Sequence, residues 1–474
     1  MNFKRTYHDY LFIIVFGLFV GYRLLDINLP FFDDEVGFYV KAVFYMQHHI
    51  ISLLPGSIPG EYSRGHPLLF LYVYSLISKL SGFHIYLLHS VSLCFSVATL
   101  FITYTLCKKI YNPVMALATV ILLMLQPVFL AQSLMVLPEM MLTFLSTLSI
   151  YYYTQNYRIL YFIACSLALL TKESGVILPL ALCCGDYINA CLIHKKVTLK
   201  KLSSFLWTLL PLSVFLTFFI IQKIQAGWFF FPVHIDFVSF YYKDIVWRAT
   251  QAIHFLFIKQ GRVLWFILFI LYIIKNYKKS ISLYTSIHDR RFISISVLFL
   301  LGIICFASLN YSLHRYLLYG IPILCILSIY CLNNLILNKT LFAIAFIILC
   351  TTSIYFTKSN SQMYDVNLSF RDMVTVNKKA IAYMEDHFLY KASIIANSPI
   401  CEEMSDTCMG YLKTKPFINV NLANDNKAIK YNNVQWCIIN DPTTFNFNSL
   451  PFKVNKIINY KSSFASTGIY KVIH

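Results

Sequence analysis

Long apolar stretches recur along most of this chain, and short polar loops separate them. Many of the stretches approach the roughly 20 residues that an α-helix needs to cross a bilayer. Only 13% of the 474 residues are charged, whereas a soluble domain carries about 25%. The sequence therefore predicts a polytopic membrane protein and excludes a soluble globular enzyme.

The basic residues gather in the short loops between the apolar stretches. A formal net charge of +18 could suggest a nucleic-acid partner. However, Lys and Arg concentrated in short loops are the pattern that fixes the orientation of membrane proteins. We therefore predict membrane lipids as surroundings and no nucleic-acid partner. The basic loops are residues 108–109, 156–158, 194–201, 275–291 and 338–339.

The same loops predict the topology of the chain. Lys4 and Arg5 keep the start of a first span, residues 10–25, on the inside. No small-residue cleavage site follows this span, so we expect it to be retained rather than removed as a signal peptide. If residues 37–49 and 67–80 lie along the membrane surface, every strongly basic short loop falls on the cytoplasmic side. About eleven spans result, with residues 26–83 as the first outer loop.

The polar tail, residues 357–474, is long enough to form a small domain of its own. Apolar spacing predicts a helix over residues 373–387. Short β-rich runs predict strands at 392–396, 434–439, 454–458 and 468–473. We therefore predict a small α/β domain on the outer face, after a membrane domain that covers residues 1–356. In an exported tail Cys401 and Cys408 would form a disulfide or stay free thiols, and the sequence leaves both open.

The densest group of acids, Asp33, Asp34 and Glu35, directly follows the first span. Adjacent carboxylates repel one another near a membrane unless they are solvated, paired or bound to a cation. A solvated loop is one interpretation. A catalytic base or a metal site is the other.

Further polar residues stand at the outer ends of predicted spans. For each of them a structural role competes with a functional one: a turn, helix-dipole compensation, an interfacial ion pair or a snorkelling arginine. Because the orientation was assigned without these residues, their common position on the outer side predicts a polar site above the bundle. They are Arg64, His66, Glu139, Lys172 and Arg315.

The order of these motifs resembles that of the GT-C glycosyltransferases, in the branch of the protein O-mannosyltransferases and the lipid A aminoarabinose transferase. Asp34-Glu35 matches the Asp-Glu motif of the first outer loop, and His66-Pro67 matches the entry to a juxtamembrane helix. Residues 133–139, Thr171-Lys172 and Arg315-Tyr316 match the later motifs. The chain departs from the family pattern with His66 in place of Lys, Glu139 in place of Asp and Glu173 in place of Gly.

The resemblance implies an inverting sugar transfer from a polyprenyl-phosphate donor to a hydroxyl of a lipid, glycan or protein. The frequent use of Ile, Lys, Asn, Tyr and Phe suggests an AT-rich genome, and we expect a bacterial inner membrane. Catalytic residues would come from Asp34, Glu35, Asp33 and Glu139, with Asp34 as the base. Arg315, His66, Arg64 and Lys172 would bind the donor phosphate. No cofactor is required, although Asp33, Glu35 and Glu139 would be able to bind a divalent metal ion.

Two other classes of membrane protein stay open. A transporter or flippase would carry ionisable residues in the middle of its spans, where this chain has almost none. A lipid-linked polymerase or ligase would use a large late outer loop. The loop 226–260 is such a loop, and it contains His234, Asp236, Arg248 and His254.

Overall fold

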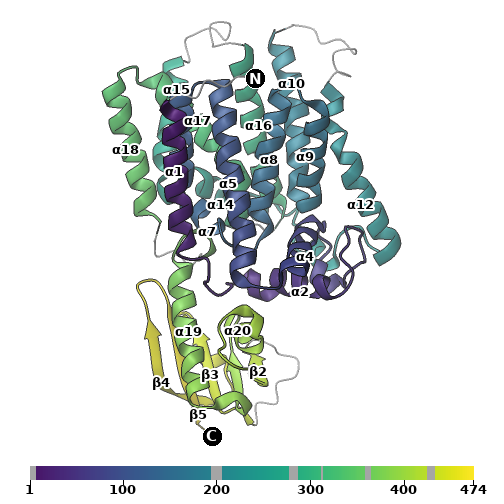
Figure 1. Cartoon of the computed structure of the whole chain (residues 1–474), viewed down its shortest axis with the longest axis vertical. Coiled ribbons are helices and arrows are strands. Elements are labelled where there is room, and N and C mark those ends of the chain that lie inside the picture. The colour runs from purple at the N-terminus through teal and green to yellow at the C-terminus, as the bar shows by residue number, and fades with distance from the viewer. Residues whose placement is uncertain are drawn as a thin grey trace.

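The computed structural model describes residues 7–193, 205–276, 287–310, 313–357, 364–423 and 433–473. Lys4, Arg5, the predicted basic loop at 194–201 and most of the loop at 275–291 lie outside these residues. The described chain forms a bundle of helices followed by a small α/β domain at one end of the bundle (Figure 1).

The bundle consists of helices of very different lengths. Within the residues that the structure describes, five candidate spans are long and apolar enough to cross a membrane: Ile85–Ile110, Glu173–Cys191, Trp207–Ala226, Arg290–Leu309 and His314–Leu335. The predicted count of about eleven spans, and the side that faces outward, stay predictions. The helices of the bundle are α1 (Tyr7–Leu24), α5 (Ile85–Ile110), α6 (Pro113–Met124), α7 (Pro127–Gln132), α8 (Pro138–Thr154), α9 (Arg158–Thr171), η2 (Glu173–Val176), α10 (Ile177–Ile193), η3 (Trp207–Leu209), α12 (Pro211–Ala226), α13 (Pro232–Asp236), α14 (Tyr242–Phe257), η4 (Lys259–Gly261), α15 (Val263–Asn276), α16 (Ile287–Leu309), η6 (His314–Gly320), α17 (Ile321–Leu335) and α18 (Lys339–Tyr355).

The first predicted outer loop folds into short helices: η1 (Glu35–Tyr39), α2 (Val40–His48), α3 (Gly60–Ser63) and α4 (Leu69–Ser81). Helices α2 and α4 pack against each other at the end of the bundle nearest the α/β domain (Figure 1). The two surface helices predicted from the sequence therefore exist. Their position relative to a membrane stays a prediction.

Local sequence signals set the starts of several bundle helices. Asn112 caps α6 by accepting a hydrogen bond from the Met115 amide at 2.9 Å, and Pro113 follows it. Asn338 caps α18 in the same way. Proline also opens α7 and α8, where a missing N–H costs nothing because the first amides of a helix have no internal partner.

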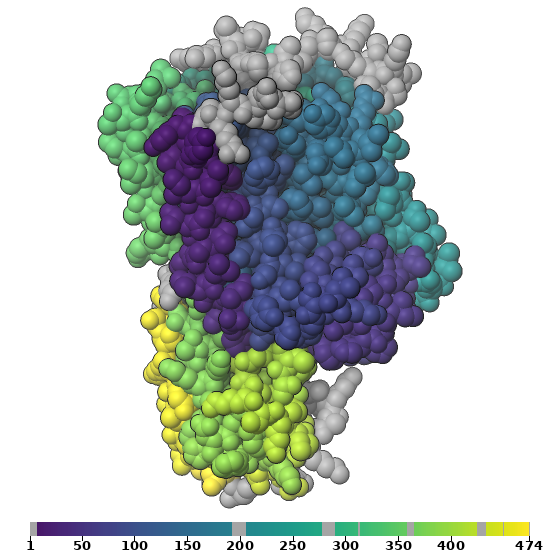
Figure 2. All heavy atoms as spheres, viewed as in Figure 1, coloured from purple at the N-terminus to yellow at the C-terminus, as the bar shows by residue number. Residues whose placement is uncertain are grey.

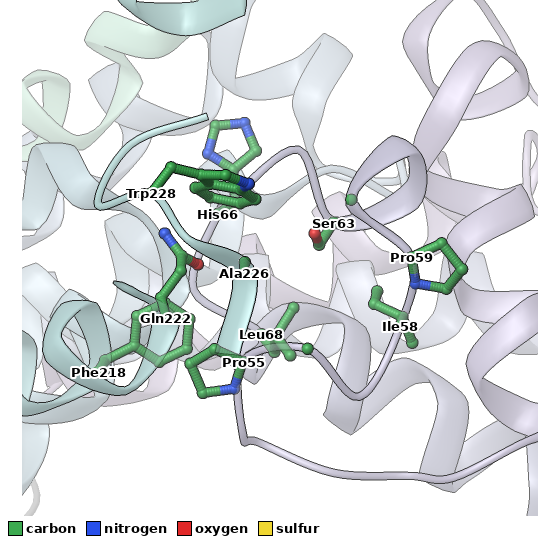
Figure 3. Close-up of a pocket in the computed structure, with 12 residues that line it drawn as sticks. Pro55, Ile58, Pro59, Ser63, His66, Leu68, Phe218, Gln222, Ala226 and Trp228 are labelled. Atoms are coloured by element: carbon green, nitrogen blue, oxygen red, sulfur yellow. The ribbon is translucent and has the colours of Figure 1, made fainter. Parts of the chain in front are cut away.

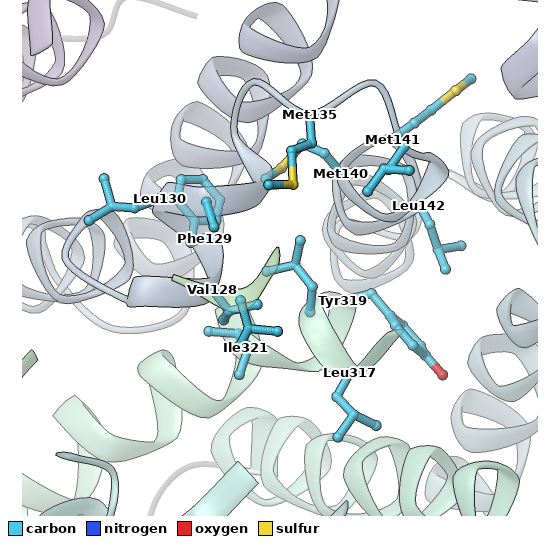
Figure 4. Close-up of a cluster of buried hydrophobic side chains, with 14 of the residues drawn as sticks. Val128, Phe129, Leu130, Met135, Met140, Met141, Leu142, Leu317, Tyr319 and Ile321 are labelled. Atoms are coloured by element: carbon cyan, nitrogen blue, oxygen red, sulfur yellow. The ribbon is translucent and has the colours of Figure 1, made fainter. Parts of the chain in front are cut away.

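A buried cluster of aliphatic, aromatic and sulfur-containing side chains lies between α7, α8 and the η6–α17 segment (Figure 4). Phe129, Met140 and Leu317 belong to it, and none is more than 2% exposed. Interiors of this kind pack closely and resist displacement. The cluster therefore fixes the ends of α8 and η6, which carry two of the predicted site residues.

The α/β domain has one five-stranded sheet of order β2-β1-β3-β5-β4. Strands β1, β2 and β3 are parallel to one another, whereas β5 is antiparallel to both β3 and β4. Alternate residues face opposite sides. Ile394 joins the core that continues into the bundle, whereas Ile395 joins a separate cluster on the other face. The elements are η7 (Tyr364–Val366), α19 (Phe370–Asp386), η8 (Leu389–Lys391), β1 (Ser393–Ala396), α20 (Ile400–Ser405), η9 (Thr407–Met409), β2 (Asn419–Leu422), β3 (Trp436–Asn440), η11 (Phe447–Ser449), β4 (Lys453–Lys461) and β5 (Ser466–Ile473).

The α/β domain contacts the segment that follows α1. Tyr411 donates a hydrogen bond to the Phe31 carbonyl at 3.0 Å, and the Phe31 amide donates to the Met409 carbonyl at 3.2 Å. Arg371 forms an ion pair with Asp26. In the space-filling view the domain abuts the end of the bundle without a visible gap on this face (Figure 2). Cys401 and Cys408 are both free thiols in the structure.

Candidate functional site

Arg315 lies at the centre of the largest group of charged side chains. Its side chain is 1% exposed and forms ion pairs with Asp34 and Asp365. The Asp33 carboxylate lies 4.0 Å from a terminal guanidinium nitrogen, and the Glu139 carboxylate lies 3.7 Å from Nε. A buried guanidinium is stable only with counter-charges around it. These four acids supply them.

Glu139 and Lys172 form a second, directly adjoining ion pair. Lys172 Nζ donates to Glu139 Oε1 at 2.7 Å, and both side chains are buried. The ammonium also lies 3.4 Å from the centre of the Tyr316 ring, where a cation–π contact adds to the pair. Glu139 Oε2 and Arg315 Nε are buried polar atoms without a hydrogen-bond partner among the described residues. They are therefore able to bind polar atoms of another molecule.

Asp33 and Asp34 sit at the turn between α1 and η1. Asp33 has a left-handed backbone conformation, with φ of 54°, and Asp34 is the residue that precedes the π-helical turn η1. The Asp33 side chain is 47% exposed and that of Asp34 26%. Partial desolvation and the charges of Asp34 and Asp365 raise the pKa of Asp33 to about 7. Asp33 is therefore a carboxyl group that changes charge near neutral pH.

Glu35 points away from this cluster and into the protein. Its carboxylate accepts hydrogen bonds from the backbone amides of Phe32, at 2.9 Å, and Val136, at 2.5 Å. His89 lies 3.7 Å from the same carboxylate. Glu35 thus joins the first outer loop to the segment before α8. Although it is part of the predicted Asp-Glu motif, it does not share the space around Arg315.

His66 forms a neighbouring polar group with Glu173. The His66 Nδ1 atom lies 2.8 Å from one Glu173 oxygen and 3.0 Å from the other. The ring of His234 lies 4.8 Å from that of His66. Desolvation and the neighbouring His66 lower the pKa of His234 to about 4. Because Glu173 directly follows Lys172, this group adjoins the cluster around Arg315.

Arg64 and Gly65 shape the turn that presents His66. Arg64 stacks on the Phe38 ring, 3.1 Å from its centre. Desolvation lowers the pKa of Arg64, and the nearby Asp34 opposes that shift. Gly65 has a φ of 70°, and a Cβ atom there would come within 2.7 Å of the Trp228 ring. Only glycine therefore allows this turn to lie against Trp228.

A cavity of about 220 Å³ lies next to His66, between the first outer loop and α12. His66 and Trp228 border it at one end (Figure 3). Its other lining is mainly apolar and comes from Pro55, Gly56, Ile58, Pro59, Gly60, Ser63, Leu68, Phe218, Gln222 and Ala226. The cavity therefore combines apolar side chains with polar groups such as Ser63, Gln222 and His66, and such a mixed lining suits an amphipathic molecule.

The three predicted metal ligands do not form one ligand set. The Glu35 carboxylate accepts two backbone amides, and one oxygen of Glu139 is bonded to Lys172. Across the described parts of the chain, no group of three His, Cys, Asp or Glu side chains is arranged to hold a metal ion.

Two residues of the cluster were not predicted from the sequence. Asp365 contacts Arg315 from the segment that follows the last helix of the bundle. Tyr39 lies close enough for Glu139 and Asp34 to affect its hydroxyl. Desolvation, and then these charges, raise its pKa well above the usual value, so this hydroxyl stays neutral. Tyr39 follows Asp34 by five residues and could have been considered, whereas no local signal marks Asp365.

Comparison with known proteins supports the sequence resemblance over part of the chain. The family model of dolichyl-phosphate-mannose-protein mannosyltransferases matches residues 65–230, about a third of the chain. This region contains His66, Glu139 and Lys172. Among curated proteins, none matches the sequence.

Solved structures match nearly the whole chain. ArnT from Cupriavidus metallidurans in the apo state gives a TM-score of 0.54 at 13% identity, over 96% of this chain and 97% of that one. The same protein bound to undecaprenyl phosphate gives 0.53 at 13% identity, over 98% and 97%. The oligosaccharyltransferase AglB from Archaeoglobus fulgidus, in complex with an inhibitory peptide and a dolichol-phosphate, gives 0.52 at 11% identity, over 93% and 70%.

These matches confirm the resemblance to GT-C glycosyltransferases that use polyprenyl-phosphate donors, and the chain has their fold. It is an integral membrane protein of mainly helical structure with a small C-terminal sheet. At this level of identity, the structures establish the fold and leave the reaction to be argued from the site.

Proposed function

We propose that this protein transfers a sugar from a polyprenyl-phosphate donor to an acceptor hydroxyl at the outer face of a membrane, with inversion at the sugar. The observation that carries the proposal is the group of Asp34, Glu139, Lys172 and Arg315. It combines a partly accessible carboxylate with buried cations at the ends of bundle helices. The family match and the shared fold support polyprenyl-phosphate chemistry as the reaction of this group.

The reaction needs a base, and Asp34 is the acid best suited to that role. An acceptor hydroxyl must lose its proton as its oxygen attacks the anomeric carbon. Asp34 is more accessible than Glu139, which is 2% exposed and already bonded to Lys172. The Asp34 carboxylate accepts the proton while the new C–O bond forms. The bond from the anomeric carbon to the phosphate oxygen breaks, and the lipid phosphate leaves with that electron pair. A single displacement of this kind inverts the anomeric carbon.

The leaving phosphate gains negative charge, and cationic groups near it lower the barrier. Arg315 and Lys172 are the two buried cations of the cluster, and Arg64 stands close to Asp34. Arginine offers two parallel N–H donors that fit phosphate geometry. The unpaired Oε2 of Glu139 would accept a hydrogen bond from the acceptor or the sugar and orient it.

The cavity beside His66 would receive the first isoprenoid units of the donor. Apolar residues such as Leu68 and Phe218 line part of it, and its His66 end leads through Glu173 to Lys172. Two departures from the family pattern, His66 and Glu173, contact each other here. His66, where the family has Lys, and Glu173, where it has Gly, therefore form a matched pair. His66 would be the member of this pair that faces the phosphate.

The polymerase or ligase alternative gains little support from its loop. His234 does approach His66. Arg248, however, donates to the backbone carbonyls of Phe237 and Leu309, at 2.9 and 3.2 Å, which is a structural role. The proposal places the protein in a bacterial inner membrane, with the site and the C-terminal domain on the outer side. The acceptor is a lipid, glycan or protein hydroxyl.

The test compares wild type with Asp34→Asn in proteoliposomes, using radiolabelled polyprenyl-phosphate sugars as donors. Asp386→Asn is the matched control, because Asp386 is exposed and lies in the tail. Asn keeps the shape of Asp34 but removes the base. We expect release of sugar from one donor by wild type and by the control, and a loss of about 10²- to 10⁴-fold in Asp34→Asn.

Each outcome assigns the result to a different part of the proposal. Equal rates in Asp34→Asn and wild type would remove Asp34 as the base and leave the transfer reaction standing. Wild type that consumes no donor with any supplied lipid, glycan or peptide acceptor would overturn the proposal in favour of the polymerase, ligase or transporter classes. A chelator arm, repeated with added Mg²⁺ or Mn²⁺, would decide whether a divalent metal ion takes part.

A further inference from the structure

Asp365 contacts the central arginine from an unexpected part of the chain. It lies in the short turn η7, between the last bundle helix α18 and the helix α19 of the C-terminal domain. Its carboxylate forms an ion pair with one terminal nitrogen of Arg315, while Asp34 pairs with the other. The Asp365 side chain is 13% exposed, half the value for Asp34.

The backbone around Asp365 is held in place by buried glutamines of the bundle. Gln132, at the end of α7, donates to the Asp365 carbonyl at 2.7 Å. Gln260, in η4, donates to the Val366 carbonyl at 2.8 Å. Both glutamine side chains are buried, so these hydrogen bonds form away from water, where leaving such groups unpaired is costly. The carboxylate of Asp365 is therefore presented from a fixed backbone.

The two carboxylates that form ion pairs with Arg315 differ in accessibility and in their expected protonation during the reaction. Asp34 is the more accessible one and, as the proposed base, changes its protonation state during each turnover. A carboxylate that gains a proton loses much of its hold on an arginine. Asp365 is less accessible than Asp34, and its backbone is anchored by Gln132 and Gln260. It keeps a counter-charge on Arg315 throughout the cycle.

We infer that Asp365 is a positioning residue that holds the Arg315 guanidinium in the orientation needed to bind the donor phosphate. This inference rests on the proposed function, because Arg315 is taken as the phosphate ligand. It also makes the segment leading into the C-terminal domain part of the active site. The juxtaposition of Asp365, Arg315 and the two glutamines carries it.

The test is a double-mutant cycle on activity: wild type, Asp365→Asn, Arg315→Lys and the double variant, with Asp386→Asn as the matched control. A displacement of about 1 Å in a catalytic group can cost about 100-fold in rate. We therefore expect Asp365→Asn to lower kcat/KM for the donor by roughly 10- to 100-fold. Because Asp365 acts through Arg315, the double variant should be no worse than Arg315→Lys by more than about threefold. Asp365→Glu should restore part of the activity.

Losses that multiply in the double variant, or an Asp365→Asn variant as active as Asp386→Asn, would overturn the inference. A parallel cycle on the thermal unfolding midpoint in detergent separates this result from the proposed function. If wild type consumes no donor, the proposed function fails. The cycle of unfolding midpoints then tests the contact between Asp365 and Arg315 by itself. Non-additive midpoints support Asp365 as the residue that holds Arg315, and additive midpoints overturn it.

Discussion

Glu403 is a buried acid that links the C-terminal domain to the pH of its surroundings. Its side chain is fully buried and accepts two hydrogen bonds from Asn377 Nδ2, at 2.9 and 3.2 Å. Burial raises its pKa to about 8, and the charges of Glu402 and Asp33 add to the rise, whereas the polar contacts with the Tyr411 hydroxyl and the Asn377 amide oppose it. Tyr411 in turn donates to the Phe31 carbonyl of the bundle.

The sign of the effect follows from the two pKa values. Glu403 releases its proton at about pH 4.5 in the unfolded chain but at about pH 8 in the folded one. The folded state therefore binds the proton more tightly, and this contribution to stability is complete below pH 4.5 and lost as the pH rises to about 8. One pKa unit corresponds to about 1.4 kcal/mol. Between pH 6 and pH 8 the free energy of unfolding should fall by roughly 2 kcal/mol, which is roughly a 30-fold change in the unfolded population.

Glu403→Gln should abolish this dependence, because Gln has the shape of the protonated acid and no charge. The probe is Cys437, a fully buried thiol in β3 that a reagent reaches only after the domain opens. Pulsed thiol labelling, read on the Cys437 peptide by mass spectrometry, compares wild type and variant at each pH, so the intrinsic pH dependence of labelling cancels. The ratio of wild-type to variant labelling should rise with pH above about 4.5, with a rise of roughly 30-fold or more between pH 6 and pH 8. Asp386→Asn is the control, because Asp386 is exposed and does not contribute to the raised pKa of Glu403. A ratio that stays constant with pH would refute the reasoning.

Two other predictions concern the donor. Asp33 should ionise near pH 7, and its carboxylate should repel the donor phosphate at higher pH. The KM for the donor should therefore rise between pH 6 and pH 8 in wild type and stay constant in Asp33→Asn. Equal pH profiles of the two proteins would contradict this prediction. Gly65→Ala should lower the free energy of unfolding by about 1 to 3 kcal/mol, because alanine would have to adopt a left-handed backbone conformation. It should also raise the KM for the donor, because the added Cβ atom would displace the Trp228 ring toward the cavity. Gly37→Ala is the control, since a Cβ there would meet nothing within 4 Å, and equal effects of the two changes would count against the steric argument.

The secondary structure of the tail was largely predictable, because its elements carry their signal locally. The predicted helix at residues 373–387 corresponds to α19, and the four predicted strands correspond to β1, β3, β4 and β5. Strand β2, Asn419–Leu422, was missed. It is a four-residue edge strand in which apolar and Asn residues alternate, and none of its residues is fully buried. Too little apolar surface marks such a strand in the sequence.

The site was predictable as far as it lies at the ends of spans. Asp34, Glu139, Lys172 and Arg315 do meet, because loops on one side of a bundle converge. The side-chain directions within Asp33-Asp34-Glu35 were not predictable. They depend on the π-helical turn η1, which sends Glu35 to the amides of Phe32 and Val136. Asp365 could not be found either, since its approach to a residue 50 positions earlier is a tertiary property.

The balance of charge around Arg315 bears on how a donor would be bound and released. Four carboxylates, those of Asp33, Asp34, Glu139 and Asp365, face two buried cations, so the formal excess is two negative charges. With Asp33 protonated, near and below pH 7, the excess falls to one. A sugar polyprenyl-phosphate carries one negative charge, which cations at the edge of the cluster, Arg64 among them, would offset. After transfer the lipid phosphate gains a second negative charge, and its repulsion by the carboxylates grows once Asp34 has released the proton that it took from the acceptor. The same acids that hold Arg315 in place would therefore favour release of the spent carrier.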